Sequence, residues 1–256
     1  MPESTGLACG GYNRDMTTRL TVTGTTRTTP SLTRVSFRSD DLTAFAGSED
    51  TDRYVKLVFP VPGQDLPVVR TYTALDPDVE AGTLAIEFVV HGDSGVAGPW
   101  AAQAHPGDEL EARGPGGSYR PDLTADWHLL VGDEAAVPAI RAALEALPPG
   151  ATAQVLVQVD SRDHEPALPA AAGVSITFVH RPGDLVEAVR SLSWLPGRVH
   201  AFVHGEAGEV MHAIRPYLLA ERGLTRDQVS ISGYWRRGRT EEGFREWKSE
   251  LARSEG

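Results

Sequence analysis

The second half of this chain alternates apolar strands with helical segments, and this alternation restricts its fold more than any other feature. Five strand-like runs follow one another: Trp127–Val131, Ala153–Val159, Val174–Val179, Val199–His204 and Gln228–Gly233. Helices are predicted among them at Ala135–Leu147, Leu185–Leu192 and Glu209–Glu221. Such alternation forms a parallel sheet with helices on its faces and a ligand site at the carboxyl ends of the strands. We therefore expect a doubly wound nucleotide-binding domain over 122–235.

The first half is rich in Thr and Val and has the pattern of short β-strands. Strands are predicted at Arg19–Thr28, Ser31–Arg38, Tyr54–Pro60, around Arg70, at Thr83–Val90 and at Asp108–Arg113. We expect Asp76-Pro77-Asp78 to form a turn. Gly114-Pro115-Gly116-Gly117-Ser118 is expected to form a flexible link between domains, unless the barrel binds a cofactor at that edge. Strands at this spacing predict a small antiparallel barrel over 16–121. We expect a disordered tail over 1–15 and a charged segment with a helix over 236–256.

Composition narrows the classes of function. A formal net charge of −11 and a pI near 5.2 argue against sequence-independent binding of nucleic acid and against an anionic membrane surface. Cys9 is the single cysteine, so the chain can form neither an internal disulfide nor a cysteine-ligated metal or iron–sulfur site. No apolar run approaches the roughly 20 residues of a membrane span, and no secretory signal is evident. We expect a cytoplasmic monomer. His200, His204 and His212 lack a carboxylate that would complete an obvious metal site, and no metal is expected.

The segment Arg70-Thr71-Tyr72-Thr73 has the residue types of a flavin cradle. Alternation along a strand places Arg70 and Tyr72 on one face, and Thr71 and Thr73 on the other. A guanidinium fits a pyrophosphate, because its fork donates two parallel hydrogen bonds. A tyrosine ring can lie on an isoalloxazine, and a threonine hydroxyl can reach a ring nitrogen. The alternative is an ordinary strand with a surface arginine.

Two glycine-containing turns are candidate ligand sites. His91-Gly92-Asp93-Ser94-Gly95 leads into a helix predicted at Pro99–Ala104, whose N-terminus suits a phosphate. The alternative is a strand-to-helix turn with nothing bound. Gly132-Asp133-Glu134 follows the first strand of the parallel sheet, where doubly wound domains hold phosphates, but it lacks the G-x-G-x-x-G pattern. Its carboxylates either orient a nicotinamide or cap the helix.

The third candidate is Gly233-Tyr234-Trp235-Arg236-Arg237-Gly238-Arg239, which combines two aromatic residues with three arginines. The aromatic rings can cover a flavin, and the arginines can grip an anionic ligand. The alternative is a solvated basic stretch that pairs with the glutamates after it.

Taken in order, these segments resemble the siderophore-interacting protein family of the ferredoxin reductase superfamily. The resemblance extends from about Arg19 to Leu251. It is carried by Thr29–Val35, Val55–Pro60, Arg70–Thr73, His91–Gly95, Pro106-Gly107-Asp108, Gly132-Asp133-Glu134 with Pro138-Ala139-Ile140, and Gly233–Arg239. The last two are the most specific.

The resemblance implies an FAD-dependent reductase that uses NADPH or NADH to reduce a ferric siderophore and release Fe(II). It implies that Arg70, Thr71, Tyr72 and Thr73 hold the flavin and its pyrophosphate. A second flavin-binding loop would comprise His91, Gly92, Gly95, Ala97, Gly98 and Trp100. The nicotinamide site would comprise Gly132, Asp133 and Glu134, with Tyr234 and Trp235 close to the flavin. Lys56 and Arg236 would attract the anionic siderophore.

The chain departs from the family pattern at four positions. Leu75 stands where the family has a second arginine, and Val96, Gly98 and Ala135 stand where it has Pro, Ser and Thr. We expect these changes to affect FAD affinity and nicotinamide handling more than the fold.

Several alternatives stay open. Ser161 and Arg162 favour the 2′-phosphate of NADPH, whereas Asp160 favours NADH. Reduced ferredoxin is a further candidate donor. The competing functions are a general flavin-dependent reductase for another acceptor and a siderophore-binding protein without turnover.

Overall fold

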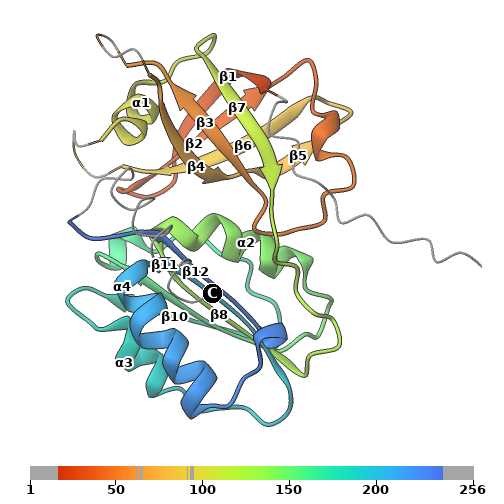
Figure 1. The fold of residues 1–256 in the computed structure, drawn as a ribbon, viewed down its shortest axis with the longest axis vertical. Coiled ribbons are helices and arrows are strands. Elements are labelled where there is room, and N and C mark those ends of the chain that lie inside the picture. The colour runs from red at the N-terminus through yellow and green to blue at the C-terminus, as the bar shows by residue number, and fades with distance from the viewer. Residues whose placement is uncertain (1–16, 62, 64–65, 91, 93–94, 239–256) are drawn as a thin grey trace, which may run out of the picture.

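The computed structural model describes residues 17–61, 63, 66–90, 92 and 95–238. The chain folds into two β-sheets that lie one above the other in Figure 1, the N-terminal sheet at the top. The predicted N-terminal tail and almost all of the predicted C-terminal segment lie outside the described residues.

The N-terminal sheet is antiparallel throughout, as predicted. Its strands are β1 Thr17–Arg27, β2 Leu32–Arg38, β3 Tyr54–Phe59, β4 Val68–Thr73, β5 Leu75–Asp78, β6 Thr83–Val89 and β7 Glu109–Gly116. They are ordered β4-β3-β7-β1-β2-β6-β5. The pairings of the described residues leave β4 and β5 at the two ends, although the sheet curls strongly (Figure 1).

Two predictions in this half are wrong. Asp76-Pro77-Asp78 belongs to strand β5 instead of forming a turn. Proline is tolerated there because β5 lies at the edge of the sheet, where a missing N–H breaks no ladder. The predicted flexible link at Gly114–Ser118 is also mostly strand, since β7 continues to Gly116 and pairs it with Tyr54.

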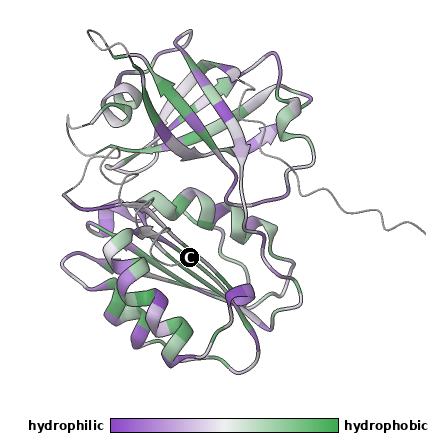
Figure 2. Cartoon of the chain, in the orientation of Figure 1, coloured by the Kyte–Doolittle hydropathy of each residue, from purple (hydrophilic) through white to green (hydrophobic). Residues whose placement is uncertain are grey.

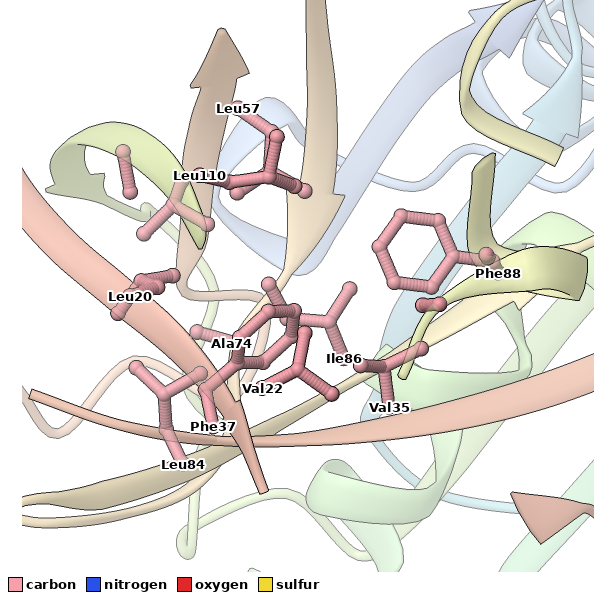
Figure 3. Packing of buried hydrophobic residues seen from close by; sticks show 14 of the residues in the cluster. Leu20, Val22, Val35, Phe37, Leu57, Ala74, Leu84, Ile86, Phe88 and Leu110 are labelled. Atoms are coloured by element: carbon pink, nitrogen blue, oxygen red, sulfur yellow. The ribbon is translucent and has the colours of Figure 1, made fainter. Parts of the chain in front are cut away.

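The core of the first sheet comes from every second residue of its strands. Leu20 and Val22 of β1 meet Val35 and Phe37 of β2, and all four are buried. Figure 3 shows these side chains pointing toward one another and toward Phe88 of β6. Along these strands, hydrophobic and hydrophilic residues alternate (Figure 2), as period-two side-chain placement requires.

The second sheet is parallel, as the strand–helix alternation predicts. Its strands are β8 Trp127–Asp133, β9 Ala153–Val159, β10 Val174–His180, β11 Val199–Glu206 and β12 Val229–Trp235. The order β10-β9-β8-β11-β12 places the first strand in the centre, which is the arrangement of a doubly wound sheet.

Helices cover both faces of the parallel sheet. Helix α1 Ala97–Gln103 packs against the N-terminal sheet, and the α-helices on the parallel sheet are α2 Val137–Ala146, α3 Leu185–Arg190 and α4 Ala207–Glu209. Short 3-10 turns lie at η1 Thr43–Phe45, η2 Glu134–Ala136, η3 Arg162–His164 and η6 Arg226–Gln228, and α4 continues as the π-helical turns η4 Val210–Ile214 and η5 Tyr217–Glu221. In Figure 1, α2 lies between the parallel sheet and the N-terminal sheet, whereas α3 and α4 cover the opposite face. Within the described part of the chain, no helix is long and apolar enough to cross a membrane.

Candidate functional site

A cavity of about 700 Å³ lies between the two sheets. Its walls come from β3, β4 and β6 on one side and from the carboxyl ends of β8, β9, β10 and β12 on the other. Small-molecule sites span roughly 300–1,000 Å³, so the cavity is large enough for a cofactor. It occupies the edge at which doubly wound sheets bind ligands.

The first sheet contributes its strand β4 to the cavity. Thr71, Tyr72 and Thr73 line it, next to Lys56 of β3, which is opposite Thr71 in the strand register. The Tyr72 ring is fixed against Phe88, with ring centroids 4.5 Å apart. Arg70 lies outside the cavity lining, and its Nη1 donates to the Val69 carbonyl at 3.1 Å.

Asp133 joins the ends of three parallel strands. Its Oδ1 accepts from the Ala135 N–H at 2.9 Å, so it caps the short turn η2. Its Oδ2 accepts from the Glu206 N–H at 2.9 Å and from the Trp235 Nε1 at 2.7 Å. Burial raises the pKa of Asp133, and these hydrogen bonds oppose the rise. Of the two roles left open from the sequence, capping is therefore observed.

Two glycines allow the strand ends that are bonded to Asp133 to pack closely together. A Cβ on Gly132 would lie 2.4 Å from the Ala136 Cβ and 2.7 Å from the His204 carbonyl oxygen. Gly205 has φ +152°, and a Cβ there would lie 2.9 Å from the Asp133 Oδ2. The sequence motif therefore needs Gly132 for close packing of the turn against β11.

Glu134 ties the two sheets together. The Ser31 hydroxyl, from the turn between β1 and β2, donates a hydrogen bond to the Glu134 Oε1, and both residues are buried. Sequence reasoning placed Glu134 at the site but missed Ser31, because the two residues are 103 positions apart.

The end of β12 brings two aromatic rings into the cavity. Tyr234 shares a side-chain hydrogen bond with Thr73 of β4, and burial raises the pKa of its phenol. Trp235 is held through its indole N–H by Asp133. Tyr234, Trp235 and Tyr72, predicted from separate motifs, therefore line one cavity. Arg236 lies outside the lining.

A buried glutamate that the sequence motifs did not identify also lines the cavity. The Glu87 side chain, on β6, is fully buried, with its Oε1 3.4 Å from the Arg141 Nη2 of α2 and 3.8 Å from the Arg34 Nη1 of β2. Burial raises the pKa of Glu87, while Arg141 and Arg34 lower it. These ion pairs therefore join the first sheet to helix α2 beside the cavity.

The predicted second flavin loop does not line the cavity in its described part. Gly92 and Gly95 adopt positive φ angles of 57° and 81°, which glycine accommodates without strain. Helix α1 packs against the first core through Ala97 and Trp100, and a Cβ on Gly98 would lie 3.2 Å from the Val89 carbonyl oxygen. His91 lies outside the described residues.

The residues that line the cavity fit a flavin. Tyr54, Tyr72, Tyr234 and Trp235 offer flat aromatic surfaces, and Thr71 and Thr73 offer hydroxyls at the same wall. Within the described residues, no group of three or more His, Cys, Asp or Glu side chains is placed to hold a metal ion.

Comparison with protein families gives matches over both halves of the chain. The model of the siderophore-interacting protein family matches residues 125–238. The model of the siderophore-interacting FAD-binding domain matches residues 21–68 and 61–119.

Individual relatives match over most of the chain. An uncharacterized protein of Mycobacterium tuberculosis is 44% identical, covering 91% of this chain and 95% of that protein. The ferric vibriobactin reductase of Vibrio cholerae is 31% identical, covering 84% of this chain and 88% of that protein.

Two solved structures describe the similarity in space. A siderophore utilization protein from T. fusca is 34% identical, with a TM-score of 0.77, covering 88% of this chain and 94% of that one. The ferredoxin reductase of carbazole 1,9a-dioxygenase superposes with a TM-score of 0.68 at 16% identity, covering 86% of this chain and 68% of that one. At that identity the match shows the fold alone, and the fold is ferredoxin reductase-like as predicted.

Proposed function

Because this chain belongs to the siderophore-interacting protein family, we propose that it is an FAD-dependent reductase of ferric siderophores. In this proposal NADPH or NADH supplies the electrons, and Fe(II) is released in the cytosol. The observation that carries the proposal is the cavity between the sheets, whose walls combine aromatic rings and hydroxyls from both halves of the chain. The ferric reductase activity named for the Vibrio cholerae relative supports it.

When bound, FAD supplies the redox chemistry, taking two electrons from the nicotinamide and passing them one at a time to Fe(III). Reduction loosens the iron, because hard oxygen ligands hold Fe(II) less tightly than Fe(III). The protein then has to position the reactants and exclude competing acceptors, and no protein acid or base is required.

The aromatic side chains that line the cavity would position the isoalloxazine. Tyr72 is braced by Phe88, Tyr234 by its bond to Thr73, and Trp235 by Asp133, so none of the three rings has to be ordered by the ligand. Preordered groups bind more tightly, because the cost of fixing them is met on folding. Arg70, with the loop that contains Gly92 and Gly95, would hold the pyrophosphate.

The carboxylates at the end of β8 would shape the nicotinamide site. Asp133 uses both oxygens within the protein, so it would act by holding Trp235. Glu134 lines the cavity beside Ala135 and Pro138 and would face the donor.

The substrate would be recognised mainly through charge. Lys56 lines the cavity on the first sheet, and Arg236 follows β12. A ferric chelate with excess negative charge would be drawn toward these cations on a chain that is otherwise acidic.

The test is an anaerobic visible spectrum of the purified protein after incubation with FAD. We expect flavin absorption that bleaches with NADPH or NADH and returns when a ferric catecholate or hydroxamate is added, while an Fe(II)-specific chelator reports the product. If reduced ferredoxin bleaches the flavin and neither nucleotide does, ferredoxin replaces the nicotinamide as the donor in the proposal. Re-oxidation by generic acceptors but not by ferric chelates would favour a general reductase. A protein that binds ferric chelate and takes up no FAD would overturn the proposal.

A further inference from the structure

A basic residue outside the sequence motifs lines the cavity beside an aspartate. Arg181 lies in the turn after β10, Asp160 follows β9 directly, and both line the cavity. The Arg181 Nε and the Asp160 Oδ1 are 3.0 Å apart, and the two side chains are 33% and 44% exposed. The ion pair therefore joins the carboxyl ends of two neighbouring parallel strands and stays accessible to a ligand.

The backbone beneath Arg181 is held at three points. Its own N–H donates to the Val159 carbonyl at 3.0 Å, and the Gly183 N–H donates to the His180 carbonyl at 2.7 Å. The Gln158 side-chain amide donates to the Gly183 carbonyl at 2.9 Å. Because the turn is fixed, a ligand has only the Arg181 side chain to reorient.

The charges around the cavity give Arg181 a distinct position. Of the described residues that line the cavity, Lys56 and Arg181 are basic, whereas Glu87, Asp133, Glu134 and Asp160 are acidic. Lys56 lies on the first sheet, so Arg181 is the basic residue that the parallel sheet contributes to this lining. An anionic group that enters over β9 and β10 would meet the guanidinium there.

The end of the second strand is where doubly wound domains distinguish the two nicotinamide donors. A carboxylate there accepts from the ribose 2′-hydroxyl of NADH, and a nearby arginine accommodates the 2′-phosphate of NADPH. Arg162 and Ser161 also follow β9, but both are exposed and lie outside the cavity lining. The Ser161 hydroxyl is engaged with the His164 Nδ1 at 2.9 Å.

We propose that Arg181 binds the 2′-phosphate of NADPH and that Asp160 holds the guanidinium at that place until the phosphate arrives. This proposal rests on the proposed use of a nicotinamide donor. Arginine suits the role, because its fork can keep one N–H edge on a carboxylate while another edge bonds a phosphate. Asp160 then acts as a positioning residue that also competes with the phosphate, so the ion pair sets the preference between the donors.

The test compares two probes that differ only in the 2′-phosphate, 2′,5′-ADP and 5′-AMP, by calorimetry on the FAD-loaded protein. We expect Arg181→Gln to weaken 2′,5′-ADP about tenfold or more and to leave 5′-AMP within about twofold. Asp160→Asn should tighten 2′,5′-ADP severalfold, because it removes the competing charge. Arg162→Gln is the matched control, an arginine lost outside the cavity, and should change neither affinity.

Flavin reduction, followed by stopped flow, separates failure of this inference from failure of the proposed function. Equal affinities of Arg181→Gln and the unchanged protein for 2′,5′-ADP would overturn the assignment, and so would a loss confined to Arg162→Gln. If NADPH still bleaches the flavin in those cases, the reductase function stands. If neither nucleotide binds or bleaches the flavin, while dithionite-reduced protein still reduces a ferric chelate, both the nicotinamide donor and the role of Arg181 are refuted.

Discussion

Asp133 shows how one buried side chain can hold together the residues around a cavity. Its two oxygens accept three hydrogen bonds, from the turn after β8, from the last residue of β11 and from the last residue of β12. Such charge-assisted bonds are each worth about 1.5–3 kcal/mol, and a buried carboxylate that lost them would be strongly destabilising. The glycine at 205 belongs to the same unit, because any side chain there would collide with the carboxylate.

Trp235→Phe tests the hydrogen bond from the Trp235 indole N–H to Asp133. A smaller aromatic ring replaces the indole and the donor to Asp133 is lost, so we expect a fall of about 1–2 kcal/mol in the free energy of unfolding. With the ring no longer fixed, the rate of flavin reduction at saturating donor should fall about three- to tenfold, with FAD content retained. Denaturant unfolding and stopped-flow absorbance measure the two effects.

Trp127→Phe is the matched control, because the Trp127 indole N–H is buried without a hydrogen-bond partner. It should cost stability through packing and leave the rate of flavin reduction unchanged. Equal reduction rates in Trp235→Phe and the unchanged protein would show that the bond is only structural.

At the scale of elements, most helices and strands are predicted from the periodicity of apolar residues along the sequence. The five parallel strands were each predicted to within two residues. The three central strands, β8, β9 and β11, are almost fully buried and form continuous apolar runs. The predicted helix at Glu209–Glu221 is helical but contains two π-helical turns. Pro216 lies between them and has no N–H to donate, so regular i→i−4 winding is interrupted there.

The failures at this scale have a common cause. From the sequence alone, proline and glycine suggest a turn. Both residues can also occupy a strand, at positions that only the topology of the sheet reveals. Asp76-Pro77-Asp78 belongs to an edge strand. Gly116 is the last residue of β7, and it is a glycine because a Cβ there would lie 2.6 Å from the Tyr54 ring. The site pairs Ser31–Glu134 and Asp160–Arg181 were likewise missed, since each joins elements that only the tertiary fold brings together.

Gly132→Ala tests whether the turn after β8 depends on close packing. The added methyl group would overlap the Ala136 Cβ and the His204 carbonyl oxygen, so we expect a loss of about 1–3 kcal/mol in the free energy of unfolding. Gly24→Ala is the control, because a Cβ at Gly24 meets nothing within 4 Å. Chemical denaturation of both variants measures the difference, and equal stabilities would refute this role of Gly132.

At the scale of the whole molecule, two buried histidines lie far from the cavity, at the opposite end of the parallel strands. His128 of β8 and His200 of β11 are adjacent in register and both buried, with ring centroids 6.3 Å apart. The His200 Nδ1 accepts from the Asp122 N–H at 3.0 Å, and the His128 Nδ1 has no hydrogen-bond partner. Burial, and then repulsion from His200, lower the pKa of His128 from 6.5 to about 4.

This shift predicts an acid-sensitive fold. The folded state favours neutral His128, so its contribution to stability is complete above pH 6.5 and is lost as the pH falls to about 4. We expect about 1–3 kcal/mol of the free energy of unfolding to disappear over this window through His128. His128→Phe should flatten this part of the stability profile.

His105→Gln is the control for the pH profile, because His105 is exposed. It should leave the slope between pH 6.5 and pH 4 unchanged. A slope in His128→Phe as steep as that of the unchanged protein would assign the acid sensitivity to other groups, such as the neighbouring His200, whose pKa is also lowered by burial.

Both sheets supply walls to one cavity, and this arrangement links the lifetime of the protein to its ligand supply. A molecule bound in the cavity contacts both sheets at once, so unfolding of either half of the chain releases it. By mass action, saturation at a hundred times the dissociation constant adds about 2.7 kcal/mol to the stability of both halves together. Chains that lack the cofactor would therefore be the first to unfold and be degraded in the cell, and abundance would follow cofactor availability without a dedicated sensor.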